Sequence, residues 1–365
     1  MDERYRERLA GASEAAGEAG LSALLVTPSA DLRYLVAYDP PPLERLTCLV
    51  IRPGRDPVLI VPELERPLAE EHVPAGLAEI RGWRETEDPY AAAAAVVGKA
   101  ERLGVSDQMW AAHLLRIQRA VRPGGTGLAS PVLGPLRAVK DDQELEVLRR
   151  SARVADEAFH RIVEERLEGL TEREVAGRLG DLLLETGAER VEFTIVGSGP
   201  NAASPHHEPG DRGVRAGDGI VLDFGGTVGG YYSDVSRTVA VAQPPEGFTE
   251  VYEVVAEAQE RAVRAVRPGV PAEEVDRAAR QVIEQAGYGD RFFHRTGHGI
   301  GLEVHEDPYI VAGNAEPLRP GMCFSVEPGI YLEGRFGVRI EDIVTVTEDG
   351  VARLNHAPRD LLVLR

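Results

Sequence analysis

The chain of 365 residues is poor in cysteine and lacks any long uninterrupted apolar run. Its two cysteines, Cys48 and Cys323, form no CxxC motif and lie in apolar, strand-like segments, which favours buried reduced thiols over a disulfide or a metal site. No uncharged run approaches the roughly 18 residues that a membrane-spanning helix needs. The first eight residues are mostly charged and lack the apolar core of a secretory signal. We therefore expect a cytoplasmic protein.

Basic residues are also in the minority. Lys and Arg number 41 against 60 Asp and Glu, which leaves a formal net charge of −19. Binding to nucleic acid or to an anionic membrane needs patches of Lys and Arg, so we expect neither as a partner. The composition, 43% hydrophobic and 28% charged, is ordinary for a folded globular chain and argues against disorder. A cytoplasmic enzyme or binding protein is the remaining class.

The first third of the chain alternates helical and strand-like patterns. Residues 3–19 and 89–102 predict helices. Short apolar runs predict buried strands over 23–26, 32–36, 46–51 and 58–61. This alternation is typical of an α/β domain with a mixed sheet. Glycines and prolines over 122–136 indicate a boundary, so we expect an N-terminal domain over 1–130, a linker over 131–140 and a second domain over 141–365.

The second domain begins with two helix-start motifs. Asp141-x-x-Glu144 and Thr171-x-x-Glu174 are capping boxes, and the second helix is expected to end near Gly187. Two more helical patterns cover 249–266 and 272–286. Strand patterns lie over 192–198, 219–224, 230–241, 322–331 and 337–347. This arrangement predicts an α+β fold of antiparallel strands with a few helices on one side.

Two aspartates interrupt these strand patterns. Asp223 ends an apolar run and precedes two glycines, and an isolated buried carboxylate is costly unless it is paired or bound to a metal. Asp234 comes after a glycine-rich turn, so the two acids could face each other across a hairpin. The alternatives are that Asp223 starts an exposed turn and that Asp234 pairs with Arg237.

Three further residues have the same character. His298 lies among glycines in Thr-Gly-His-Gly-Ile-Gly, which lets the backbone approach closely, although a lone histidine is more often structural. Glu327 comes after an apolar run and precedes Pro-Gly. Strand alternation places Arg339 and Glu341 on one face, a pattern that an ordinary surface strand also explains. Four carboxylates and an imidazole together suit Mn²⁺, Co²⁺, Fe²⁺ or Zn²⁺.

With these five residues in view, residues 192–348 resemble the pita-bread metallopeptidases. That family includes methionine aminopeptidase, aminopeptidase P, prolidase and creatinase. The order Asp, Asp, His, Glu, Glu matches the family's metal ligands at Asp223, Asp234, His298, Glu327 and Glu341. The resemblance implies two divalent ions, with manganese expected and cobalt or zinc as alternatives. It assigns Asp223 to one ion, His298 and Glu327 to the other, and Asp234 and Glu341 to both.

Two other motifs are similar to the branch that cleaves Xaa-Pro bonds. They cover residues 198–206 and 297–306, and the resemblance places His206 and His305 in the substrate pocket. Imidazoles there can hold the negative charge that develops on the carbonyl oxygen of the bond to be cleaved. On the same analogy, Glu327 is the general base.

The resemblance bears on three more positions. Arg339 matches a family arginine that could order Glu341 or bind a substrate carboxylate. His294 could orient a ligand from outside the metal shell. His207 is a departure, because prolidases often have glycine there, and it could alter the pocket rim.

The resemblance implies a pita-bread catalytic domain preceded by a smaller α/β domain, and a metallo-exopeptidase that hydrolyses the bond before proline. Segments 293–306 and 337–342 look closest to prolidases, so Xaa-Pro dipeptides are the expected substrates. The alternatives are an Xaa-Pro aminopeptidase acting on longer peptides, a methionine aminopeptidase and a non-catalytic peptide-binding relative. Retention of all five ligands disfavours the last and disfavours metal-free creatinase. The family usually forms homodimers, and the loop at 39–42 is a candidate contact with the partner.

Overall fold

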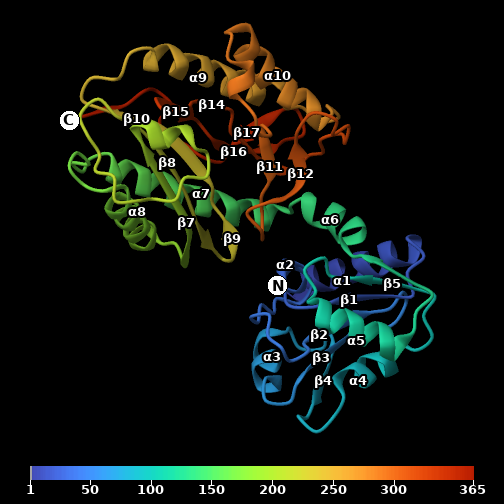
Figure 1. Cartoon of the computed structure of the whole chain (residues 1–365). Helices are drawn as coiled ribbons and strands as arrows, with labels where there is room; N and C mark the ends of the chain where they lie inside the picture. The colour runs from blue at the N-terminus through green and yellow to red at the C-terminus, as the bar shows by residue number, and fades with distance from the viewer. Residues whose placement is uncertain (1) are drawn as a thin grey trace. The chain divides into compact units, whose positions relative to one another are not determined.

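The structure is a computed structural model, and it describes residues 2–365. The chain forms two compact units, one that ends at Arg137 and one over Ala138–Arg365 (Figure 1). The residues expected as a linker, 131–140, largely form helix α6 (Ser130–Ala138).

The first unit is built on a six-stranded mixed sheet. Its strand order is β4-β3-β2-β1-β5-β6. The strands are β1 (Ala23–Val26), β2 (Cys48–Ile51), β3 (Val58–Pro62), β4 (Glu79–Trp83), β5 (Arg102–Val105) and β6 (Gly125–Leu128). The other helices of this unit are α1 (Asp2–Glu18), α2 (Ala30–Val36), α3 (Arg66–His72), α4 (Pro89–Val97) and α5 (Ala111–Val121). The α/β alternation predicted from the sequence is therefore present.

One predicted strand of this unit is wrong. Residues 32–36 belong to helix α2, which buries Leu32, Leu35 and Val36. These three residues have the i, i+3, i+4 spacing of a helix face, and the run is too short for periodicity alone to separate a helix from a buried strand. The helix ends at Ala37, whose φ of 60° is left-handed.

The second unit contains two five-stranded sheets and a separate hairpin. One sheet has the order β18-β10-β8-β7, with β9 paired to β8, and the other has the order β12-β11-β13-β16-β17. The first comprises β7 (Arg190–Ser198), β8 (Gly219–Val228), β9 (Tyr231–Tyr232), β10 (Val235–Val241) and β18 (Val363–Leu364). The second comprises β11 (Gly297–Gly299), β12 (Glu306–Ile310), β13 (Cys323–Val326), β16 (Asp342–Val346) and β17 (Val351–Arg353). Strands β14 (Gly329–Leu332) and β15 (Phe336–Arg339) form the hairpin.

The main helices of this unit form two pairs, α7 (Asp142–Ile162) with α8 (Glu172–Thr186), and α9 (Phe248–Ala265) with α10 (Ala272–Gln285). One apolar cluster joins the first pair to β8 and β10, and a second joins the other pair to β13 through β16. The pairs lie on opposite sides of the strands (Figure 1), so the expectation of helices on a single side is wrong. Each sheet has an apolar face that must be covered, which requires a helical layer for each.

Local sequence signals define the first helix pair. Both predicted capping boxes are formed, at Asp141 with Glu144 and at Thr171 with Glu174. Helix α8 ends at Gly187, as expected, with a φ of 116° that favours glycine. The boundaries of α8 are therefore set by the residues at its two ends.

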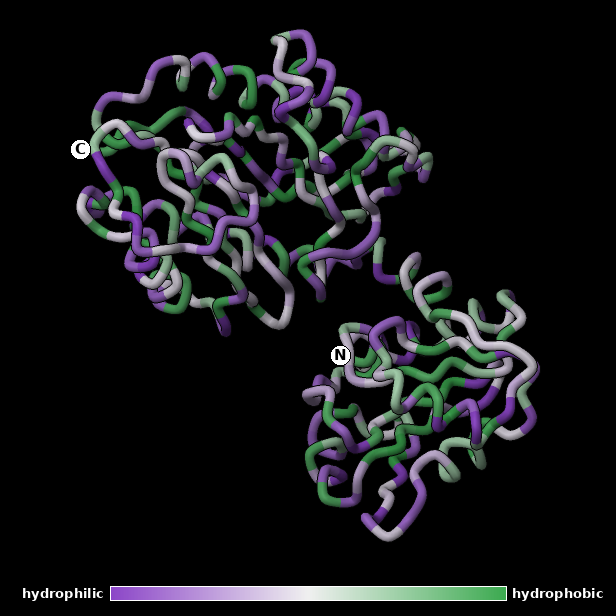
Figure 2. Tube along the Cα trace, viewed as in Figure 1, coloured by the Kyte–Doolittle hydropathy of each residue, from purple (hydrophilic) through white to green (hydrophobic). Residues whose placement is uncertain are grey.

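Hydrophobic residues concentrate in the strands of each unit, and hydrophilic residues lie along the outer turns of the helices (Figure 2). Cys48 and Cys323 are buried free thiols, as predicted. Among the described helices, none combines the length and apolar composition needed to cross a bilayer.

Candidate metal centre and substrate cavity

A cavity of about 380 Å³ in the second unit brings the predicted site residues together. Its lining includes all eight candidates: Asp223, Asp234, His298, Glu327, Glu341, His206, His305 and Arg339. Asp223 comes from β8, and Asp234 from the turn that precedes β10. His206 comes from the segment between the 3-10 helix at Gly199–Ala203 and β8, and the other five come from the strands and turns of the second sheet and the hairpin.

The two aspartates meet through strand pairing. Strands β8 and β10 are antiparallel, with Phe224 opposite Val235 and Asp223 opposite Ser236. Asp234 directly precedes β10, so both carboxylates reach the same cavity across the hairpin. Arg237 does not take Asp234 as its partner, because its guanidinium forms an ion pair with Asp342.

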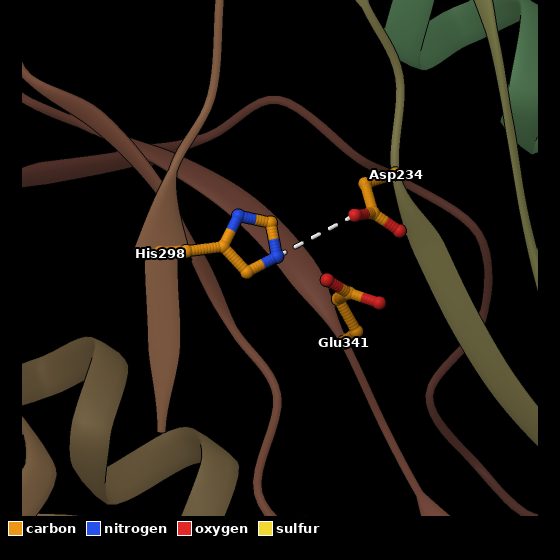
Figure 3. Close-up of side chains that lie close together, drawn as sticks. All are labelled: Asp234, His298 and Glu341. Carbon is orange, nitrogen blue, oxygen red and sulfur yellow. Dashed lines mark ion pairs between the residues drawn. The ribbon is translucent and has the colours of Figure 1, made fainter. Parts of the chain in front are cut away.

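The imidazole of His298 lies between carboxylates. Its Nε2 atom is 3.2 Å from Oε1 of Glu327 and 3.6 Å from Oδ2 of Asp234. Ligand atoms of Asp234, His298 and Glu341 all lie within 4.8 Å of one another, and the three side chains point toward a common centre (Figure 3). Such a cluster of one nitrogen and several carboxylate oxygens can hold a divalent ion.

The charges of the cluster are poorly balanced by the protein. Burial raises the pKa of Asp223, Asp234 and Glu341, and neighbouring carboxylates raise it further. Burial also opposes ionisation of Glu327, but the hydrogen bond and charge of His298 outweigh it and lower its pKa to about 2. Oδ1 of Asp223 and Oε1 of Glu341 are buried and have no hydrogen-bond partner among residues 2–365. Buried carboxylate acceptors of this kind, grouped around an imidazole nitrogen, suit a cation, so the residues fit a divalent-metal centre.

Arg339 orients the acidic cluster through hydrogen bonds. Only 3% of Arg339 is exposed, and its guanidinium donates to Oδ2 of Asp223, to Oη of Tyr331 at 2.9 Å and to Oγ of Ser236 at 2.9 Å. Ser236 in turn donates from Oγ to Oε2 of Glu341 at 2.8 Å. The arginine therefore orients Asp223 directly and Glu341 through one hydroxyl.

His294 belongs to the same network. Its Nδ1 is 2.7 Å from the carbonyl oxygen of Arg295, and its Nε2 is 2.9 Å from Oη of Tyr331. Burial lowers the pKa of His294, which favours the neutral ring. Because a carbonyl only accepts, Nδ1 carries the proton and Nε2 accepts from the tyrosine. Sequence reasoning missed Tyr331, since a tyrosine in a strand hairpin has no local feature that marks a distant partner.

The substrate side of the cavity combines imidazoles with apolar side chains. The ring of His305 stands at 90° to that of His298, with 4.3 Å between the centroids. Burial and the nearby charges of His298 and Arg295 lower the pKa of His305 to about 4, so this imidazole is neutral at physiological pH. The apolar part of the lining is Phe193, Ile195, Pro205 and Val304.

His207 turns away from this lining. Its Nε2 atom is 2.7 Å from Oε2 of Glu172, a fully buried residue of α8. The side chain of His207 therefore contacts Glu172 rather than forming part of the pocket rim, where the sequence led us to expect an effect. Glu172 is a second residue that sequence reasoning missed, because its capping-box neighbour Glu174 explained the local pattern.

A carboxylate and imidazole cluster fitted to a divalent ion, on a two-sheet α+β domain that comes after an α/β domain, defines a metal-dependent hydrolase. Residues 146–348 match the model of metallopeptidase family M24, and residues 8–139 match that of the creatinase/prolidase N-terminal domain. The chain belongs to metallopeptidase family M24. The predicted pita-bread catalytic domain with a smaller α/β domain before it is confirmed.

Three relatives illustrate how closely the whole chain matches the family. The chain is 44% identical to the probable dipeptidase PepE of Mycobacterium tuberculosis, over 99% of this chain and 97% of that protein. The crystal structure of dipeptidase PepE from Mycobacterium ulcerans has 43% identity and a TM-score of 0.95, covering 100% of this chain and 99% of that one. A prolidase from Thermococcus sibiricus has 41% identity and a TM-score of 0.93, with 99% of each chain covered.

Proposed function

We propose that the chain is an Xaa-Pro dipeptidase whose metal centre holds two divalent ions. The observation that carries this proposal is the common cavity, in which the five candidate ligands lie beside His206, His305 and an apolar wall. Relatives that bear the names dipeptidase and prolidase, and that align over nearly the whole chain, support it.

The proposed ligands are Asp223, Asp234, His298, Glu327 and Glu341. Manganese is the proposed ion, with cobalt or zinc as alternatives. Divalent ions in such a site lower the pKa of water and polarise a carbonyl group, which supplies the nucleophile for amide hydrolysis. The unpartnered oxygens of Asp223 and Glu341 support this assignment.

The side chains themselves would position and transfer protons. Glu327 would accept a proton from the attacking water at its carboxylate and return it to the leaving prolyl nitrogen. His206 and His305 would hold the developing oxyanion. The nitrogen before cleavage is a tertiary amide with no N–H, so a cavity that asks for no donor there can accept a substrate that general peptidases reject.

Arg295 supports the choice of dipeptides over longer peptides. It lines the cavity, and its guanidinium carbon lies 4.5 Å from the ring centroid of Tyr309. Arg339 is committed to Asp223 and Tyr331, whereas Arg295 has no ion pair with any carboxylate among residues 2–365. We propose that Arg295 binds the free carboxylate of the substrate proline, a group that only an Xaa-Pro dipeptide presents at this distance from the cleaved bond.

Hydrolysis of matched peptides tests this function. Ala-Pro, Ala-Pro amide and Ala-Pro-Ala share the same bond and differ only in the group attached to the proline carbonyl carbon. With Mn²⁺ or Co²⁺ bound, we expect the highest kcat/KM for Ala-Pro. Preference for Ala-Pro-Ala would favour an Xaa-Pro aminopeptidase, and no cleavage of any of the three by metal-loaded protein would reject both.

Three further properties are proposed with this function. The N-terminal domain is proposed to span 1–130 and the catalytic domain 141–365, with a linker over 131–140; separate family matches over 8–139 and 146–348 support the division into two domains. The chain is proposed to form a homodimer in which the loop at 39–42 contacts the partner, as the family leads us to expect; light scattering can check the dimer. Its location is the cytoplasm, where its two free thiols would stay reduced.

A further inference from the structure

The carboxylate of Glu172 is a hub of hydrogen bonds beneath the substrate side of the cavity. Its Oε1 accepts from the backbone N and Oγ of Ser198, at 2.8 Å and 2.7 Å, and from Nδ2 of Asn201 at 3.0 Å. Its Oε2 accepts from Nε2 of His207 at 2.7 Å and from the backbone N of Gly210 at 3.3 Å. Every donor lies on one segment, residues 198–210, which we name the His206 segment.

The His206 segment carries Pro205 and His206 into the cavity lining. It has little regular structure of its own beyond a short 3-10 helix over Gly199–Ala203. A segment of this kind needs side-chain hydrogen bonds to hold one conformation, because it has no strand ladder to fix its backbone. Glu172 supplies them from the first turn of α8, whose start is fixed by the Thr171 cap.

Burial makes this arrangement demanding. Glu172 has no exposed surface, and a buried carboxylate is tolerated only when its oxygens are satisfied. Burial alone would raise the pKa of Glu172, but hydrogen bonds from His207 and Ser198 outweigh it and hold the pKa below its ordinary value. Interaction with the helix dipole alone would not explain the burial of Glu172, because an exposed acid in the first turn of a helix interacts equally well with that dipole.

A second set of bonds ties the same segment to the sheet. Arg212 pairs with both oxygens of Asp218, at 2.7 Å and 2.9 Å, and also donates to Oγ of Ser198 at 2.6 Å. Gly199 passes over this pair with a φ of +52°, and an added Cβ would lie 2.6 Å from atoms of both partners. The hub therefore extends from Asp218 through Ser198 and Glu172 to His207.

The link to chemistry is the adjacency of His206 and His207. Because the two residues share a peptide bond, fixing the His207 ring against Glu172 limits where the His206 ring can lie. We propose that Glu172 is a positioning residue that, through His207, holds His206 at the reacting carbonyl. This inference rests on the proposed function, which gives His206 its contact with substrate.

A double-mutant cycle tests the proposal. The variants are Glu172→Gln, His206→Ala and the pair, measured for kcat and KM on Ala-Pro, together with bound metal and thermal unfolding. The glutamine amide would place a donor against His207 and Gly210, so we expect kcat to fall by up to about 100-fold with metal content unchanged. In the His206→Ala background the same change should lower kcat by less than about threefold, because the group to be positioned is gone. Glu174→Gln is the matched control, since it removes a carboxylate from the same turn that, among residues 2–365, accepts hydrogen bonds only from Thr171.

A second pair of variants covers the case in which Glu172→Gln fails to fold. His207→Ala should lower kcat, and His207→Gln should restore most of it, because the side-chain amide nitrogen of glutamine can still donate to Glu172. Equal losses from Glu172→Gln with and without His206, or equal kcat for His207→Ala and His207→Gln, would overturn the positioning role alone. If His206→Ala leaves kcat unchanged, the catalytic assignment of His206 fails, and the positioning role fails with it.

Discussion

Arg339 and Asp223 form a buried ion pair at the metal cavity, with Nη2 of the arginine 2.5 Å from Oδ2 of the aspartate, although 116 residues separate them in the chain. The pair occupies one aspartate oxygen and leaves Oδ1 without a protein partner among residues 2–365. It thereby fixes the carboxylate plane while one oxygen remains available to a cation. Arg339 also bonds Tyr331 and Ser236, so its role depends on the planar guanidinium, which donates in several fixed directions, and not on charge alone.

The first prediction concerns the guanidinium group of Arg339. Arg339→Lys keeps the charge but cannot make all three bonds, so metal affinity and kcat/KM should fall by roughly 10–100-fold. Calorimetric titration of Mn²⁺ into metal-free protein and steady-state kinetics on Ala-Pro measure the two effects. Arg335→Lys is the control, since Arg335 is an exposed neighbour bonded to the carbonyl of Glu246. Wild-type metal affinity in Arg339→Lys would contradict the orienting role.

The second prediction concerns a proposed ligand itself. Asp234 is 5% exposed and shares the ligand cluster with His298 and Glu341. Asp234→Ala should lower bound metal per chain and reduce turnover by more than the roughly 10–100-fold that loss of a supporting residue costs. Elemental analysis of the dialysed protein and kinetics check both, with Asp349→Ala, an exposed turn residue, as the control. Full activity of Asp234→Ala with a normal metal content would refute the assignment of Asp234 as a metal ligand.

Features with a local signature could be predicted from the sequence. Helices α7 and α8 begin where Asp141 and Thr171 predict them, because a capping box satisfies the first backbone N–H groups within four residues. The candidate ligands were recognisable for a similar reason, since Asp223 interrupts an apolar strand and His298 lies among glycines. The order Asp, Asp, His, Glu, Glu, which matches the family, then grouped these residues into one site, although they lie on segments that local sequence patterns alone could not connect.

Features that depend on distant partners could not be predicted. Tyr331 and Glu172 become important only when folding brings them to Arg339 and to the His206 segment, and nothing in their neighbouring residues indicates it. The wrong strand at 32–36 has a different cause, because its short apolar run suits a helix and a strand equally. There the tertiary environment selects the helix, because the apolar face of α2 packs against the rest of the first unit.

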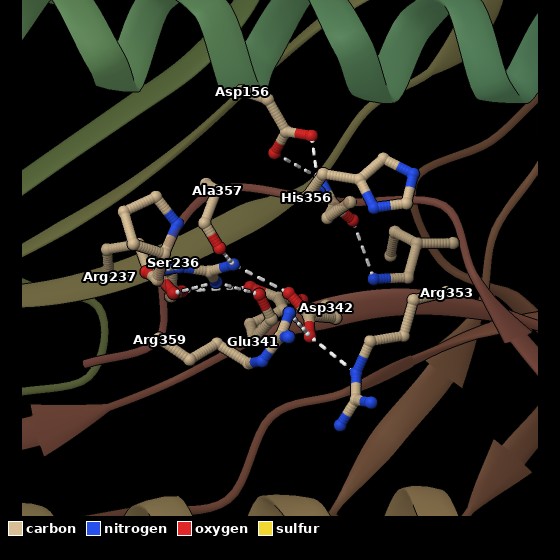
Figure 4. Close-up of polar contacts among 12 residues, drawn as sticks. Asp156, Ser236, Arg237, Glu341, Asp342, Arg353, His356, Ala357 and Arg359 are labelled. Atoms are coloured by element: carbon tan, nitrogen blue, oxygen red, sulfur yellow. Dashed lines mark hydrogen bonds and ion pairs between the residues drawn. The ribbon is translucent and has the colours of Figure 1, made fainter.

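The third prediction concerns stability. Asp342 is fully buried and accepts a hydrogen bond from Gln259. It also accepts hydrogen bonds from three arginines, Arg237, Arg353 and Arg359 (Figure 4). Removing one partner of a buried pair leaves the other charge uncompensated, so Asp342→Ala should lower the free energy of unfolding by about 3–5 kcal/mol. Urea denaturation measures this loss.

An exposed ion pair provides the comparison. Glu257 and Arg261 are about half exposed, with side-chain values of 50% and 62%, and Glu257→Ala should change the free energy of unfolding by less than about 1 kcal/mol. Equal effects of the Asp342 and Glu257 substitutions would show that the Asp342 network does not stabilise the fold.

The fourth prediction concerns the two thiols. Burial raises the pKa of Cys48 to about 12 and also raises that of Cys323. Both groups are therefore protonated at pH 8, and only the thiolate reacts as a nucleophile. A disulfide reagent should label neither cysteine of the native protein within minutes, and should label both once guanidinium unfolds it. Rapid labelling of the folded chain would show that the burial of these side chains is incorrect.

The fifth prediction tests the proposed carboxylate site at Arg295. Replacing the guanidinium in Arg295→Met removes the only arginine of the cavity lining that has no carboxylate partner among residues 2–365, while keeping much of the contact with Tyr309. KM for Ala-Pro should rise by roughly 10-fold or more, since a charge-assisted hydrogen bond contributes about 1.5–3 kcal/mol. Ala-Pro amide lacks the carboxylate, so its KM should change little. A matched rise for both peptides would indicate that Arg295 shapes the cavity rather than binding the carboxylate. An unchanged KM for Ala-Pro would place the carboxylate elsewhere and withdraw the main support for a dipeptide substrate.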